Sequence, residues 1–323
     1  MSPMKLVEAE GPALGQILDQ THPLWSDGLS RVAYERFNEA QLRTPWGRDH
    51  LRRYLLAGDD GRVLSTAKRY DLRARLDGRE IRIVGLGAVF TPAGERGRGH
   101  AAAIVERIVE AAERDGAELA VLFSEIDPAF YAASGFVAVP RHESMIRVRP
   151  AGGAPMIMVR DGAAADVPTV VALADRMSGG HRFALAHSDA LVRFGLSKKR
   201  LLAGFLPAGE LSVDFHVIEE GGGAVAFAVI TVTETDAVLE MCGDRDPSGA
   251  RVGALLQTLR ARTPGERMPP LTGFLPHGWC PPQVEVEEGA LARAVMMVRP
   301  LRDGVLDTPL TGRDVLFWHG DLF

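Results

Sequence analysis

The fold of this chain is decided by the stretch Ile83-Val84-Gly85-Leu86-Gly87-Ala88-Val89-Phe90-Thr91-Pro92-Ala93-Gly94-Glu95-Arg96-Gly97-Arg98-Gly99-His100-Ala101. It begins as an apolar, strand-like run and continues as a turn rich in Gly and Arg. Apolar residues then recur at helical spacing, at Ile104, Val105, Ile108 and Val109. The turn is therefore expected at a helix N-terminus, where backbone N–H groups lack partners and the helix dipole is positive. Such an end binds anions, and a diphosphate would fit there.

The residue types in the turn favour the same ligand. Gly97 and Gly99 have no Cβ to hold a ligand away from the backbone, and glycine tolerates the positive φ angles that a nest of inward-pointing N–H groups needs. Arg96 and Arg98 add charge that is permanent at any ordinary pH. The competing interpretation is a solvated turn with incidental charge.

The flanking residues extend this pattern on both sides. Asp77-Gly78 separates two strand-like runs, 68–76 and 80–90, and Asp-Gly in that position predicts a hairpin. The run 118–123 predicts a buried strand, and a short helix with a turn is expected within 127–136.

Two motifs in this region carry a family resemblance. Arg96, Gly99 and Ala101 fit the pattern R-x-x-G-x-A, and the run 130–136 fits F-Y-x-x-x-G-F. With this order and spacing, the N-terminal half resembles a complete domain of the GNAT N-acetyltransferase superfamily. The resemblance implies an α+β fold, in which a mixed, largely antiparallel sheet is flanked by helices. In one departure, three residues separate Pro92 from Arg96 where the family commonly has two, so the loop is expected to bulge.

The resemblance implies an N-acetyltransferase that uses acetyl-CoA as co-substrate and needs no metal. The pyrophosphate would bind the residues Arg96, Gly97, Arg98, Gly99, His100 and Ala101. The fourth and fifth strands splay apart in this family, so the backbone near Ala88, Val89 and Phe90 would bind the pantetheine amides and the thioester carbonyl. Tyr131 matches the tyrosine that protonates the departing thiolate. The alternative for Tyr131 is a core residue packed on Phe130.

The general base has no motif of its own. Glu125 is the first candidate because it follows the fifth strand, where the acceptor groove of the family opens; a surface glutamate beside a turn is the alternative. Phe323 is the second candidate, because in one multi-domain branch of the family, which the chain resembles around Ser124-Glu125 and Tyr131, the terminal carboxylate reaches the active site. A terminal segment docked for stability alone would explain the same aromatic residues.

The acceptor is expected to be a primary amine on a small molecule or a free amino acid. Trp25, Asp27 and Trp46 lie in the region that lines the acceptor groove in the family. Aromatic walls and a carboxylate suit a cationic amine. The same three residues would serve equally well as core and cap.

The second half repeats the plan incompletely. We expect a GNAT domain over 1–149, a linker over 150–155 rich in Pro and small residues, and a degenerate GNAT-like domain over 156–323. Strand-like runs occur at 156–160, 211–218, 224–232 and 237–241. The turn that follows the last of these contains Asp244 and Asp246, which would repel a phosphate by about 1 kcal/mol or more per close pair. We therefore expect this half to support the first half without binding CoA in the usual way.

Composition narrows the function further. The chain has 323 residues, of which 46% are hydrophobic and 24% charged, as in soluble globular proteins of about two domains. A net charge of −5 argues against nucleic acid as a partner, and no run approaches the roughly 18 apolar residues of a membrane span. No secretory signal is evident, so a cytoplasmic location is expected. The two cysteines, Cys242 and Cys280, are interpreted as packing residues, and the run 198–200 as a solvated basic face.

Two other classes of function stay open at this point. One is an acyl-CoA-binding sensor or regulator without catalysis, against which Tyr131 argues. The other is an interaction protein that binds a partner through the proline-rich loop between Met268 and Pro282.

Overall fold

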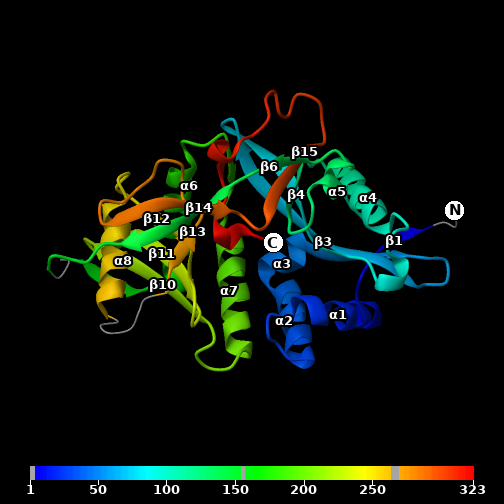
Figure 1. The fold of residues 1–323 in the computed structure, drawn as a ribbon, viewed down its shortest axis with the longest axis horizontal. Helices are drawn as coiled ribbons and strands as arrows, with labels where there is room; N and C mark the ends of the chain where they lie inside the picture. Colours follow the sequence, from blue (N-terminus) through cyan, green and yellow to red (C-terminus); the bar gives the residue numbers. More distant parts are fainter. Residues whose placement is uncertain (1–3, 154–156, 263–268) are drawn as a thin grey trace.

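Two β-sheets with flanking helices lie side by side in the computed structural model (Figure 1), which describes residues 4–153, 157–262 and 269–323. Along the first sheet the strand order is β1 (Lys5–Glu8), β2 (Leu51–Ala57), β3 (Val63–Leu76), β4 (Arg79–Phe90), β5 (Leu119–Ser124), β15 (Val295–Pro300) and β6 (Val137–Val139). The short strands β9 (Phe183–Leu185) and β16 (Val315–Leu316) extend it beside β3. Its helices are α1 (Gly11–Trp25), α2 (Arg31–Arg43), α3 (Pro45–His50), α4 (His100–Arg114) and α5 (Ala129–Ala132).

The second sheet has the order β14 (Val284–Leu291), β7 (His142–Val148), β13 (Leu271–Gly273), β12 (Ala237–Asp244), β11 (Gly223–Val232), β10 (Ser212–Glu220) and β8 (Met158–Asp161). Its helices are α6 (Val167–Ser178), α7 (Asp189–Phe205) and α8 (Ala250–Arg262). Four short 3-10 turns complete the structure: η1 (Ala93–Glu95), η2 (Ala164–Asp166), η3 (Gly312–Asp314) and η4 (His319–Asp321). This is the α+β architecture that the sequence predicts, with two mixed sheets. Among the described residues, no helix has the length and apolar character needed to cross a membrane.

The predicted hairpin forms at Asp77-Gly78. Both residues have positive φ, +48° and +81°, as a two-residue turn between twisted strands requires, and Leu76 pairs directly with Arg79. The predicted helix also forms, and α4 buries its apolar face (Ile104, Val105, Ile108, Val109 and Ala112) against the sheet. Local sequence therefore determines the unit β3, β4 and α4.

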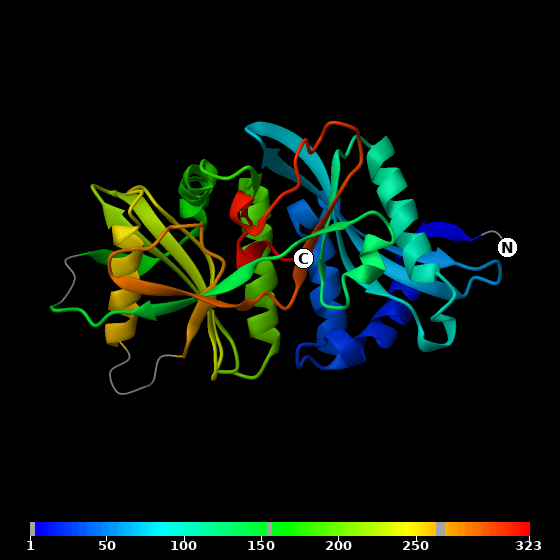
Figure 2. The same cartoon turned by 45° about the horizontal axis from the view of Figure 1, so that its top comes forward.

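The two halves exchange strands. β7 leaves the first half and pairs with β13 and β14 of the second sheet. In return, β15 leaves the second half and pairs with β5 and β6 of the first. Figure 2 shows the two crossing connections between the sheets. The predicted linker 150–155 follows β7 directly, and its residues 154 and 155, like Met156 of the first expected strand of the second half, lie outside the described residues.

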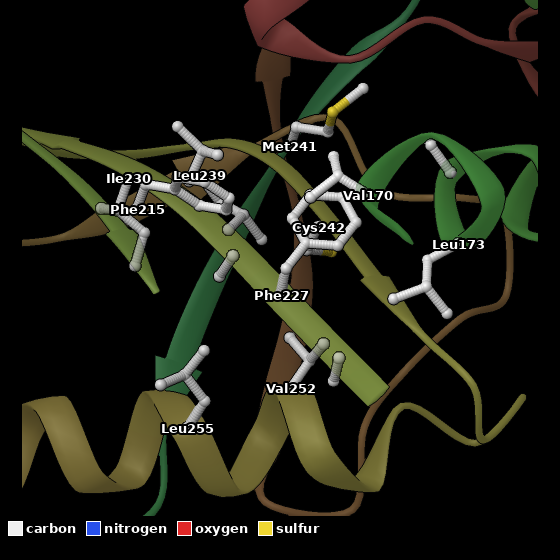
Figure 3. Packing of buried hydrophobic residues seen from close by; sticks show 14 of the residues in the cluster. Val170, Leu173, Phe215, Phe227, Ile230, Leu239, Met241, Cys242, Val252 and Leu255 are labelled. Atoms are coloured by element: carbon white, nitrogen blue, oxygen red, sulfur yellow. The ribbon is translucent and has the colours of Figure 1, made fainter. Parts of the chain in front are cut away.

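The core of the second half surrounds Phe227 of β11, which is fully buried. Helices α6 and α8 both pack on β11 and β12, and Figure 3 shows Val170 and Leu173 of α6 and Val252 of α8 around this ring. Cys242 lies in the same cluster, as a packing residue should. Cys280 is exposed, so its interpretation as a packing residue is wrong; it belongs to a loop rather than to the sheet.

Residues 49–56 have an amphipathic pattern that would suit a helix, but α3 ends at His50 and β2 occupies residues 51–57. Buried residues alternate in the first part of β2, and the strand pairs with β1 and β3 on its two edges. Pairing on both edges outweighs the weak helical pattern of the sequence.

Candidate active site

Strands β4 and β5 separate where the resemblance predicts. Their parallel pairing runs from Ile83↔Leu119 to Leu86↔Leu122 and stops there. Beyond this point β5 pairs only with β15, through Phe123 and Ser124. On the other edge of β4, a β-bulge interrupts the pairing with β3, and Ala88 in the bulge has φ +49°. The backbone of Ala88, Val89 and Phe90 therefore has no β5 partner.

The Gly and Arg turn follows directly and leads into α4. The loop is one residue longer than is common in the family. The 3-10 turn η1 (Ala93–Glu95) accommodates this extra residue. Gly97 and Gly99 have φ angles of +75° and +78°, and a Cβ on either would meet no atom within 4 Å. Backbone conformation, and not crowding, thus requires these glycines. Gly99 is the N-cap of α4, and no side chain caps the helix. Its first N–H groups are therefore available to an anion.

A buried carboxylate shapes this loop. Glu95 is 6% exposed and lies 2.8 Å from Arg62, 3.2 Å from Arg98 and 3.4 Å from Nε2 of His100. Arg96 instead donates from Nε to the backbone oxygen of Thr91 at 3.1 Å. Glu95 belongs to no motif in the sequence, although a single carboxylate beside two arginines in one turn indicates an ion pair within the loop. Because Glu95 compensates part of the charge of Arg98, the backbone N–H groups carry more weight as an anion site.

Tyr131 lies on α5 beside this helix. Its side chain belongs to the core cluster of α4 and β5 and makes edge contacts with Phe130 at 4.9 Å and Phe136 at 6.2 Å between ring centroids. Asp127 begins the helix, since its Oδ1 accepts the N–H of Ala129 at 2.9 Å. Burial raises the pKa of Tyr131 to about 12, so the phenol stays protonated at neutral pH.

Phe323 lies on one face of the first sheet, over Gly85 and Gly87 of β4. A Cβ on Gly85 would lie 2.5 Å from the ring of Phe323, and a Cβ on Gly87 would lie 3.1 Å from its backbone oxygen. The ring packs against Tyr70 and Phe123, at centroid distances of 4.9 Å and 5.2 Å. Both glycines are therefore needed for the approach of Phe323, a function that the apolar run by itself did not reveal.

The segment before Phe323 fills the corresponding opening in the second half. There β12 and β13 pair in parallel from Ala237↔Leu271 to Leu239↔Gly273, and η4 packs against β12 beyond this point. Buried Glu240 accepts hydrogen bonds from Thr231 at 2.6 Å and from Nδ1 of His319 in η4 at 3.0 Å. Burial would raise the pKa of Glu240, but the hydrogen bond from His319 and the charge of Lys199 prevail and lower it to about 2. The contacts of η4 with β12 thus hold the segment that leads to Phe323 over β4.

A cavity of about 90 Å³ lies between the halves next to Phe323. Its walls include the aromatic rings of Trp46, Tyr70 and Phe194 and the ammonium group of Lys198. The run 198–200 is thus not simply a solvated basic face, because α7 lies between the two halves (Figure 1) and Lys199 forms a 2.7 Å ion pair with Glu240. Burial lowers the pKa of Lys198 to about 8.

Three other residues that the sequence predicts for the acceptor groove or as the base differ in their burial and contacts: Trp25, Asp27 and Glu125. Trp25 contacts Phe90 edge-on at 6.2 Å. Partial burial raises the pKa of Asp27. The positive charge of Lys198 partly offsets this rise, and the negative charge of Glu125 adds to it. Glu125 itself is exposed at the end of β5. Among the described residues, no group of three or more His, Cys, Asp or Glu side chains is placed to hold a metal ion.

The turn before α8 differs from the turn before α4 in one decisive respect. Asp244 is 2% exposed, and its carboxylate accepts the backbone N–H groups of Arg251 at 2.9 Å and Val252 at 3.1 Å. It also accepts the N–H of Asp246 at 2.8 Å. An internal carboxylate therefore occupies the helix N-terminus that a pyrophosphate would need, which is a stronger reason than charge repulsion for this half not to bind CoA there.

Replacing Asp244 with Ala is expected to lower the free energy of unfolding by about 3 kcal/mol, because three backbone N–H groups, that of buried Val252 among them, lose a charged acceptor. Asp244→Asn keeps an acceptor oxygen and should cost about half as much. Denaturant unfolding measures both, and Asp246→Ala in the same turn is the control. Equal stability of Asp244→Ala and Asp246→Ala would contradict this account of the helix end.

Comparisons with known proteins follow the same lines. Residues 19–139 match a family model described as an acetyltransferase (GNAT) domain. A search of curated proteins finds no match for the sequence. Among solved structures, a GCN5-related N-acetyltransferase from Kribbella flavida is similar, with 16% identity, a TM-score of 0.70, and coverage of 93% of this chain and 71% of that chain.

Two further structures are similar over most of their length. One is a conserved protein from Enterococcus faecalis, described as a probable N-acyltransferase, with 12% identity, a TM-score of 0.69, and coverage of 93% of this chain and 73% of that chain. The other is the N-myristoyltransferase of Saccharomyces cerevisiae with bound myristoyl-CoA, with 9% identity, a TM-score of 0.58, and coverage of 97% and 85%. At these identities the likeness shows a shared fold, in which two similar halves are joined in one chain.

Proposed function

We propose that the chain transfers an acetyl group from acetyl-CoA to a primary amine, because residues 19–139 match the model of a GNAT acetyltransferase domain and the chain has a tandem GNAT fold. The observation that carries this proposal is the junction of β4 and α4. The backbone of residues 88–90, which has no β5 partner, and the uncapped start of α4 are adjacent in the chain and suit the two ends of one extended ligand.

The residues of the first half divide the binding between them. The N–H groups at Gly97, Gly99, His100 and Ala101 would hold the pyrophosphate, with Arg96 and Arg98 adding charge. The backbone of residues 88–90 would bind the pantetheine amides and polarise the thioester carbonyl. Bound acetyl-CoA supplies the activated acyl carbon, and the C–S bond breaks as the amine nitrogen forms a bond to it.

Two proton transfers complete the proposed reaction. Tyr131 donates its phenolic proton to the departing sulfur, and its raised pKa means that this proton is present at neutral pH. The attacking amine loses its proton to a carboxylate. Phe323 is favoured for this role, because its backbone carbonyl lies over Gly87, just past the last β4 residue that pairs with β5, whereas Glu125 is exposed at the end of β5. The proposal for Phe323 applies where this residue ends the chain and its carbonyl carbon is a carboxylate.

The cavity next to Phe323 supports a small acceptor. At about 90 Å³ it is smaller than the roughly 150 Å³ site that holds benzene in an engineered protein core, so it accommodates a group the size of one side chain. Trp46 in its wall and Asp27 near Lys198 fit an amine with an apolar body. A small amine or a free amino acid is therefore favoured over a folded protein substrate.

Calorimetric titration with acetyl-CoA, followed by thiol release with a panel of small amines, tests the proposal. Saturable binding with amine-dependent thiol release is the expected result. Binding without release by any amine would identify an acyl-CoA sensor. The absence of binding at millimolar acetyl-CoA would leave only a structural or interaction function for this fold.

Gly99→Val is expected to raise the dissociation constant for acetyl-CoA by about tenfold, because a β-branched residue strains a φ of +78° by more than 1 kcal/mol and displaces the N–H groups. The rate at saturating acetyl-CoA should change little. Gly94→Ala is the matched control, since this glycine of the same loop lacks a positive φ and has open space around it. Identical affinities of the two variants would exclude this turn as the pyrophosphate site.

A further inference from the structure

A second, larger cavity lies where the exchanged strands leave their sheets. Its volume is about 830 Å³, within the roughly 300 to 1,000 Å³ of small-molecule sites. One wall is the start of β7 with Arg141 before it, another is the loop after β13, and the third is η3 with its flanking residues. It shares no lining residue with the cavity next to Phe323, and nothing in the proposed acetyl transfer uses it.

Arg141 is the unusual residue of this cavity. It is 8% exposed, yet among the described residues no carboxylate lies within ion-pair distance of it. Its guanidinium donates one hydrogen bond, from Nη2 to the backbone oxygen of Phe317 at 2.8 Å, and its Cζ lies 4.2 Å from the centre of the Phe274 ring. Five N–H donors on a permanently charged group are far from satisfied by one carbonyl.

The pKa of Arg141 reflects the same imbalance. Burial lowers it to about 10, and the more distant carboxylate of Asp321 only partly counteracts the effect. Asp321 cannot move to Arg141 without loss, because its two oxygens already accept hydrogen bonds from His187 and from the N–H of Trp318. Among the described residues, this largely buried cation therefore has a carbonyl partner and an aromatic contact but no carboxylate within ion-pair distance.

The other walls fit a flat anion. Phe274 and Trp279 supply aromatic surface, and Arg313 and His277 add groups that carry or can acquire positive charge. The one carboxylate in the lining, Glu288, has a side chain that is 75% exposed and lies 3.4 Å from His142. The proline-rich loop that the sequence singles out therefore forms the aromatic side of a mainly cationic recess.

We propose that this cavity binds a small organic anion with a flat apolar body, whose carboxylate or phosphate head pairs with Arg141. The guanidinium has donors in one plane and can bind either head group through two parallel hydrogen bonds. The flat body would lie against the aromatic wall made by Phe274 and Trp279. A ligand of this kind places a negative charge beside Arg141, which no carboxylate of the described residues does within ion-pair distance.

Calorimetry with four probes tests the site on the intact chain. Benzoate and phenyl phosphate carry the two head groups on one ring, benzylamine carries the opposite charge, and inorganic phosphate has no flat body. We expect benzoate or phenyl phosphate to bind with a dissociation constant below about 1 mM, and the tighter of the two identifies the head group. Benzylamine should not bind, and inorganic phosphate should bind at least about tenfold more weakly than phenyl phosphate.

Variants then locate the binding. Arg141→Met should weaken it at least about tenfold. Arg147→Met is the matched control, because Arg147 is exposed on the same strand and does not line the cavity. Ser144→Phe places a large side chain in the cavity while leaving Arg141 in place, so it should weaken binding even if Arg141→Met proves too unstable to measure. Lys198→Met alters the cation of the other cavity and should leave binding unchanged.

Three results would overturn the proposal. The first is no binding of either aromatic anion at millimolar concentration. The second is equal binding of benzoate and benzylamine, which would show that the charge of Arg141 is irrelevant. The third is binding that survives Ser144→Phe but disappears in Lys198→Met, which would place the anion beside Phe323 instead.

Discussion

Replacement of Tyr131 by Phe should lower kcat by about 10² to 10⁴-fold, the usual contribution of a positioned general acid. The phenol is the one proton donor that the family motif places at the departing sulfur, and burial keeps it protonated. Affinity for acetyl-CoA should change by less than about twofold, because the proposed binding contacts are elsewhere. Thiol release under single-turnover conditions measures the chemical step directly.

The pH dependence of the same reaction provides a second test. An ordinary tyrosine with a pKa of about 10 would be half ionised at pH 10 and would lose half its activity as an acid. Because the pKa of Tyr131 is raised to about 12, kcat should show no decline from this group between pH 8 and pH 10. Tyr54→Phe is the control, since it removes a half-buried tyrosine of the same half on β2. Unchanged turnover in Tyr131→Phe would remove this residue from the mechanism.

Extension of the chain by one glycine after Phe323 should lower kcat by about 10²-fold or more, if the carboxylate of Phe323 is the general base. The added residue turns that carboxylate into an amide and moves the negative charge by about 3.8 Å, one Cα spacing. Rates with a saturating amine, compared at pH 7 and pH 9, measure the effect.

Two control variants separate the possible causes. Phe323→Leu keeps the position of the carboxylate and removes the ring contacts with Tyr70 and Phe123, so it should reduce kcat much less than the extension does. Glu125→Gln tests the other candidate base. If the extended chain remains fully active while Glu125→Gln is inactive, the proton is accepted at the end of β5 and not at the C-terminus.

Features encoded by short stretches of sequence could be predicted. The Asp77-Gly78 turn, the start of α4 at His100 and the short helix at Tyr131 depend on residues within a few positions of one another. The separation of β4 and β5 came from the family resemblance and is present in the structure. The catalytic roles of Tyr131, Glu125 and Phe323 stay predictions, because the structure gives their positions and not their chemistry.

Features that depend on distant contacts could not be predicted. The pairing of Val295 with Ser124 joins segments whose local patterns are ordinary strands, so nothing in either stretch reveals which sheet it joins. The burial of Lys198 follows from the position of α7 between the halves, which a run of three basic residues does not indicate. The same holds for Arg141: that no carboxylate of the described residues lies within ion-pair distance of it is visible only once the surrounding elements are assembled.

The strand exchange also sets the order in which the protein can mature on the ribosome. The first sheet lacks the strand between β5 and β6 until residues 295–300 have been synthesised, after every described strand of the second sheet. Until then, the edge of β5 at residues 119–124 is unpaired and able to associate with other chains. A nascent chain stalled or truncated near residue 150 thus exposes an adhesive edge, and chaperone protection is needed most in this interval.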